Sequence, residues 1–134
     1  MISGTGKGID EYRKQSVSSA SPVQLVVMLY DAAIRNAELG RIAMEGGRIQ
    51  EQNDHLLKTQ RILSELSCSL DMQQGGEVAQ SLLGLYTYCL NQLTSANIDD
   101  KPEPVREVVK ILENLRDAWR QIAESQNEEG AVAA

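Results

Sequence analysis

Apolar side chains recur every three or four residues along four long stretches of the chain, and polar, Gly- or Pro-containing segments separate these stretches. This spacing places the apolar side chains on one face of a helix, and no stretch shows the strict alternation that is typical of a half-buried strand. Helices of similar length joined by short loops pack as antiparallel neighbours. The pattern predicts an all-α fold: an antiparallel up-down four-helix bundle with a short N-terminal helical segment.

Local signals set the expected helix bounds. Ser21-Pro22 followed by Gln24 has the spacing of a capping box, so the first long helix is expected to start there and to end near Glu45, before Gly46-Gly47. The other helices are expected from about Arg48 to Leu70, from Glu77 to Asn97 after the QQGG segment at 73–76, and from close to Pro104. The apolar face of the third includes Val78 and Leu85. Trp119, on the apolar face of the last, is expected to be largely buried.

The two ends of the chain differ from its middle. Residues 1–8 are rich in Gly and residues 124–134 are polar and then small, so both are expected to be disordered, with the helical domain at 9–123. Ile9, Tyr12 and Val17 are the sizeable apolar side chains between the expected disordered start at 1–8 and Ser21. They predict a short helical turn that either extends the core or covers a binding surface.

Composition and charge narrow the function. A chain of 134 residues forms one domain, and its net charge of -6 argues against nucleic acid or anionic membranes as partners. No apolar run approaches the roughly 20 residues of a membrane span, and the N-terminus lacks the apolar stretch of a signal peptide. We expect a cytoplasmic protein without membrane insertion.

The chain is poor in catalytic groups. A di-iron bundle needs two Glu-x-x-His pairs, whereas His55 is the only histidine, and Cys68 and Cys89 do not form a Cys-x-x-Cys pair. On one helix, His55 is more than three turns from Cys68 and cannot activate it. We expect no metal, no cofactor and no catalytic residue.

One short motif supports an alternative. His55-Leu56-Leu57-Lys58 resembles the H-x-L-K-G signature of histidine phosphotransfer domains, which are also helical bundles, although Thr59 replaces the glycine. For a match of only four residues, a solvent-exposed histidine without a special role is the favoured explanation. By contrast, the apolar faces together with Ile9 and Tyr12 offer more surface than a small core needs, which favours a protein that binds a helical segment of a partner; extra core packing is the competing interpretation.

Three sequence blocks carry a family resemblance. SPVQLVVMLYDAAI at 21–34, GGEVAQSLLGLYTYCLNQLTSAN at 75–97 and LRDAW at 115–119, with Gly8-Ile9 and Tyr12 before them, resemble the FliS family of flagellin-specific export chaperones. Ala32 and Ser81 replace a usual Gly and Asn. The resemblance implies a bundle that binds the C-terminal segment of flagellin, prevents premature polymerisation and delivers flagellin to the flagellar export gate.

The resemblance also suggests where flagellin binds. In the family, the residues that match Ile9 and Tyr12 are associated with the partner groove, so the segment is expected to cover this groove until flagellin displaces it. The expected partner-binding residues are Ile9, Tyr12, Val17, Leu25, Met28 and Leu29.

Overall fold

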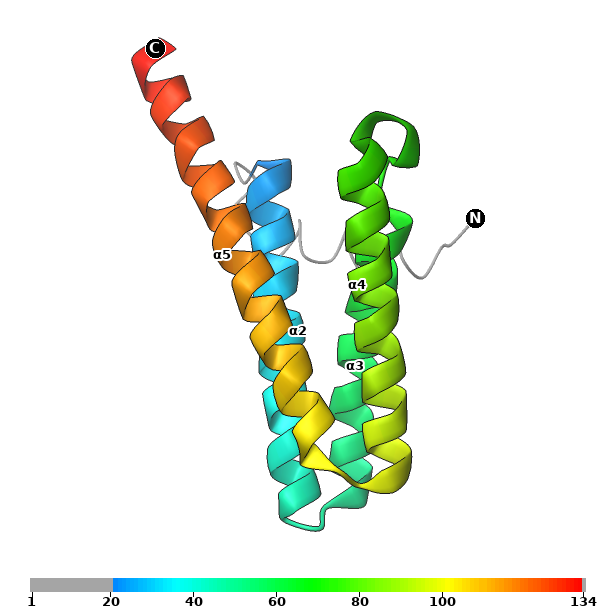
Figure 1. The fold of residues 1–134 in the computed structure, drawn as a ribbon. Coiled ribbons are helices and arrows are strands. Elements are labelled where there is room, and N and C mark those ends of the chain that lie inside the picture. Colours follow the sequence, from blue (N-terminus) through cyan, green and yellow to red (C-terminus); the bar gives the residue numbers. More distant parts are fainter. Residues whose placement is uncertain (1–20, 134) are drawn as a thin grey trace.

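The computed structural model describes the backbone of residues 21–133 and the side chains of residues 21–127. Its helices are α2 (Pro22–Glu45), α3 (Ile49–Cys68), α4 (Met72–Asp99) and α5 (Pro102–Ala133), and the described residues contain no strand. Figure 1 shows the four helices running alternately up and down, which confirms the all-α bundle. The expected N-terminal helical segment at 9–20 lies outside the described residues.

The start of α2 follows from its sequence. The Ser21 hydroxyl accepts a hydrogen bond from the Gln24 backbone N–H at 3.1 Å, and the Ser21 N–H donates to the Gln24 side chain at 2.8 Å. Pro22 occupies the first turn, where no backbone donor is needed. The predicted capping box is confirmed.

The start of α4 combines a capped turn with the expected break. Asp71 accepts hydrogen bonds from the Gln73 and Gln74 N–H groups, so a first helical turn begins at Met72. Gly76 then leaves the helical conformation, with a φ of 52° and a ψ of -128° that favour glycine. The QQGG segment therefore interrupts the helix, and the regular part of α4 follows from Glu77, as predicted.

The last helix is longer than expected at both ends. α5 begins at Pro102, because proline is tolerated in a first turn, and continues to Ala133 through residues that were expected to form a disordered tail. Glu, Gln and Ala have good helix propensity, and extending an existing helix costs far less than starting one. Trp119 packs against the core and only a minor part of its surface is exposed, which agrees with the prediction that it is largely buried.

Helix α2 forms the centre of the packing. It contacts α3 and α5 extensively, whereas α4 packs less extensively on the same two helices and lies diagonally opposite α2. Eleven of the 24 residues of α2 are buried, compared with five of the 28 residues of α4. Across the core, the hydroxyl groups of Tyr30 on α2 and Tyr86 on α4 share a buried hydrogen bond.

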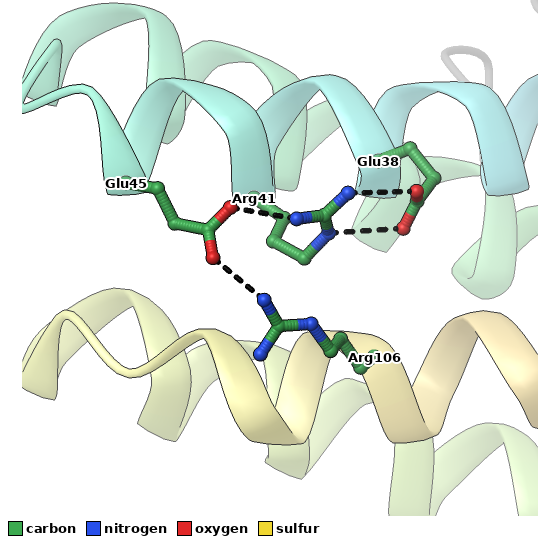
Figure 2. Close-up of polar contacts among 4 residues, drawn as sticks. All are labelled: Glu38, Arg41, Glu45 and Arg106. Atoms are coloured by element: carbon green, nitrogen blue, oxygen red, sulfur yellow. Dashed lines mark hydrogen bonds and ion pairs between the residues drawn. The ribbon is translucent and has the colours of Figure 1, made fainter.

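Charged side chains line the contact between α2 and α5. Figure 2 shows Arg41 bound to Glu38 and Glu45 on its own helix, with Glu45 also 2.6 Å from Arg106 on α5. Farther along, Asp31 lies 3.3 Å from Arg116. Asp31, Glu38 and Glu45 are spaced by seven residues, so they follow one side of α2. Ion pairs therefore follow this side of α2 where it meets α5.

Candidate partner-binding surface

The structure does not bring the expected site residues of α2 together on one surface. Leu25 and Leu29 are 8% and 5% exposed and belong to the interior, while Met28 is half-buried and lines a surface hollow. Ile9, Tyr12 and Val17 lie outside the described residues. Met28 is therefore the one described member of the expected set that a partner can contact directly.

The hollow beside Met28 lies between the first turns of α2 and the second half of α5. It has a volume of about 340 Å³ and is lined by Gln24, Val27, Met28, Arg120, Ala123, Glu124 and Asn127. Val27, Met28 and Ala123 are apolar, whereas Arg120 and Glu124 carry opposite charges. The hollow is large enough for a single apolar side chain.

A second surface has a different character. From Val78 to Ile98, α4 contains no charged residue, although most of its outward positions are exposed. We call its exposed residues in this range the α4 outer face: Val78, Gln80, Ser81, Leu83, Gly84, Leu85, Thr87, Tyr88, Asn91, Thr94, Ser95 and Ile98. Five of the eleven exposed large apolar side chains in the described residues belong to this face. No other described helix combines exposure and absence of charge over such a length.

One edge of this face turns toward α5. The Tyr88 hydroxyl and the Gln92 amide donate hydrogen bonds to the Glu107 carboxylate at 2.7 and 2.8 Å. Leu85 and Val78 precede Gln92 by seven and fourteen residues, so they lie on the same side of α4. These two side chains are 36% and 69% exposed, so α5 does not cover them.

The combination of exposed apolar side chains and absent charge is typical of the centre of a protein interface. We therefore identify the α4 outer face as the candidate partner-binding surface. The sequence pattern places Val78 and Leu85 on the apolar face of this helix, and no binding residue was expected there. The missing charge between Glu77 and Asp99 is visible in the sequence and was the signal that could have found this surface.

His55 has a structural position. Its Nδ1 lies 3.0 Å from the Asn36 side-chain oxygen, and the Asn36 amide group donates to the Ala32 carbonyl. The Asn36 oxygen is thus the acceptor and His55 Nδ1 the donor, which joins α3 to α2. His55 is half-buried, not fully exposed to solvent.

The cysteines and acidic residues form no reactive centre in the described part of the chain. Burial, with a smaller effect of Glu107, raises the pKa of the Cys89 thiol to about 11, so this thiol stays protonated at neutral pH. Cys68 is exposed and unpaired. Residues 21–127 contain no cluster of three or more His, Cys, Asp or Glu side chains that could hold a metal ion, and none of the described helices is both long and apolar enough to cross a membrane.

Comparison with known proteins agrees with the fold and with the absence of a reactive centre. The family model for the flagellar protein FliS matches residues 6–126. The chain belongs to the FliS family. Members of this family are flagellar secretion chaperones and not enzymes, so FliS membership removes the phosphotransfer alternative at His55.

Individual relatives support the same assignment. The flagellar secretion chaperone FliS of Vibrio cholerae is 36% identical over 118 residues, covering 85% of this chain and 87% of that protein. The FliS of Salmonella typhimurium is 36% identical over 124 residues, covering 89% and 92%. A crystal structure of a bacterial flagellar chaperone has a TM-score of 0.73 at 20% identity and covers 89% of this chain and 97% of that one, which supports the fold.

Proposed function

We propose that this FliS chaperone acts in the cytoplasm, binds the C-terminal segment of flagellin, prevents its premature polymerisation and delivers it to the export gate of the flagellar type III apparatus. Family membership supports a role in flagellar secretion. The observation that carries the proposal is the α4 outer face, because its long, uncharged, partly apolar surface suits a helical segment better than a small ligand.

Such a surface suits a cargo that orders when it binds. If flagellin's C-terminal segment is disordered in the monomer and helical in the filament, its free apolar side chains promote association with other copies. Covering them on α4 blocks this association. Part of the interaction energy offsets the cost of ordering the segment, so binding over a long surface remains reversible at the export gate.

The expected binding residues keep a place in this proposal. Met28 contributes to a second contact in the α2–α5 hollow, and Leu25 and Leu29 support this end of α2 from the interior. Ile9, Tyr12 and Val17 shield apolar surface in the empty chaperone and give way to flagellin. Deleting residues 1–17 is then expected to tighten binding and speed association, because a covered site lowers the apparent affinity. Weaker binding with an intact fold would contradict this shielding.

The main test places one charge on each of two diagonal helices. Leu83 on the α4 outer face and Leu39 on α2 are 37% and 40% exposed, so Leu→Lys alters a similar amount of apolar surface at each. Titration of a flagellin C-terminal peptide is expected to show at least about tenfold weaker binding for Leu83→Lys, because an unpaired charge is then buried in the complex. Leu39→Lys is expected to stay within about twofold of wild type. Equal affinities for the two variants would exclude α4 as the binding surface.

A further inference from the structure

We infer that Gly84 marks the point on the α4 outer face where a helix of the partner approaches the α4 backbone most closely, and that one large apolar side chain of the partner sits over it. This inference rests on the proposed function. It adds where on α4 the contact lies and that the side chain at position 84 must be small.

None of residues 21–127 explains a glycine at this position. Glycine inside a helix costs roughly 0.5–1 kcal/mol relative to alanine. A Cβ at Gly84 would meet no atom of the described residues within 4 Å, and Gly84 is not among the residues with positive φ. A helical residue with free space around it has no internal need to be glycine.

Other glycines in the described residues have an internal reason. At Gly40 a Cβ would lie 2.6 Å from Leu56, and at Gly75 it would lie 2.6 Å from Ala79. Gly47 and Gly76 have positive φ angles of 73° and 52°. Gly84 differs from all four, because no residue of the described part of the chain limits the side chain at this position. This difference supports a contact with the partner.

The surroundings of Gly84 indicate what this neighbour is. Ser81, Thr87, Tyr88 and Asn91 lie three, three, four and seven residues away, so helical periodicity places them around Gly84 on the same side of α4. All are uncharged and exposed. Without a side chain at Gly84, the backbone of α4 stays uncovered among these uncharged residues, one of which is aromatic. A large aliphatic or aromatic side chain of the partner can lie against such a surface.

Charge defines the partner further. Residues 78–98 span about 30 Å of helix at 1.5 Å per residue, without a charge that could pair with one on the partner. A charged side chain pressed against this face would lose its water without gaining a counter-charge. The occupant is therefore one amphipathic helix of the flagellin C-terminal segment, lying along α4 with its uncharged stripe inward.

A size series at position 84 tests the inference. Gly84→Ala and Gly84→Leu have free space in the unbound chain, so their thermal midpoints are expected to equal or exceed that of wild type. Binding of a flagellin C-terminal peptide is expected to weaken about threefold for Gly84→Ala and at least about thirtyfold for Gly84→Leu, because each added group holds the partner farther away. Ser64→Ala and Ser64→Leu, on the exposed surface of α3, are the matched controls and are expected to change binding less than about twofold.

The outcomes separate this inference from the proposed function. If wild type binds the peptide and all variants bind equally, Gly84 is not a contact point although the chaperone function stands. If the Ser64 variants lose as much affinity as the Gly84 variants, the effect is not specific to α4 and the inference is likewise overturned. If wild type does not bind the peptide, both proposals fail.

Discussion

Helices α2 and α4 lie diagonally across the same bundle and have opposite surroundings. α2 is packed between α3 and α5, buries nearly half of its residues and carries ion pairs along its edge with α5. α4 buries fewer than a fifth of its residues and exposes uncharged side chains from Val78 to Ile98. The comparison teaches that α2 holds the fold together, whereas α4 is the helix available to a partner.

Leucine substitutions are expected to give the largest difference in stability between the two helices. Leu29→Ala on α2 is expected to lower the free energy of unfolding by about 2–5 kcal/mol, because it leaves a cavity in the core. Leu83→Ala on α4 is expected to cost less than about 1 kcal/mol, because the side chain is already partly exposed. Denaturant unfolding of both variants measures this difference. Similar losses would contradict the division between a structural α2 and an available α4.

Gly→Ala substitutions are expected to give the next largest change in stability. The change is expected to have opposite signs on the two helices. At Gly40 on α2, an added Cβ would approach a Leu56 side-chain carbon to 2.6 Å, so Gly40→Ala is expected to destabilise the fold by about 1–3 kcal/mol. Gly84→Ala on α4 is expected to stabilise it by up to about 1 kcal/mol. Thermal unfolding monitored by circular dichroism reports both changes. A stabilising Gly40→Ala would show that the α2–α3 contact is looser than described.

The buried tyrosine pair tests how α2 and α4 are coupled. Tyr30→Phe and Tyr86→Phe each leave one buried hydroxyl without its partner and are each expected to cost about 1–2 kcal/mol, while the double variant is expected to cost less than the sum. A double-mutant cycle measures the coupling. Strict additivity would mean that the hydrogen bond contributes nothing to the contact between the two helices.

The same pair has a pH signature. Burial raises the pKa of both Tyr30 and Tyr86 above 10, the ordinary value, so the folded chain keeps protons that the unfolded chain releases. The stability from this shift is complete below pH 10 and is lost as the pH rises toward the folded-state pKa. Unfolding measured above pH 10 is therefore expected to show a steeper loss of stability in wild type than in the double Phe variant.

The smallest expected effect belongs to the ion pairs between α2 and α5. Glu45→Gln is expected to lower stability by less than about 1 kcal/mol, because Glu45 and Arg106 are both well exposed. The difference between wild type and Glu45→Gln is expected to shrink in 1 M salt, since screening weakens exposed pairs. A loss that persists in high salt would show that packing, and not charge, is responsible.

Sequence reasoning was most successful where the cause is local. Ser21, Pro22 and Gln24 fix the start of α2 through contacts within one turn, so they can be recognised without the fold. Burial depends on neighbours that are distant in sequence. Apolar spacing showed that Val78 and Leu85 belong to an apolar stripe, but not that their neighbours leave them exposed. For the same reason Leu25 and Leu29 were expected at the binding surface although they lie in the interior.

The light packing of α4 also affects how the bundle opens. Local opening is easiest where little apolar surface must be exposed, and α4 is joined to the core by five buried residues, among them Tyr86, Cys89 and Leu93. Its backbone amides are therefore expected to exchange with deuterium faster than those of α2 in the empty chaperone. A bound cargo helix would slow the exchange in α4 far more than in α2, so the same loose attachment that exposes this helix makes it the natural reporter of occupancy.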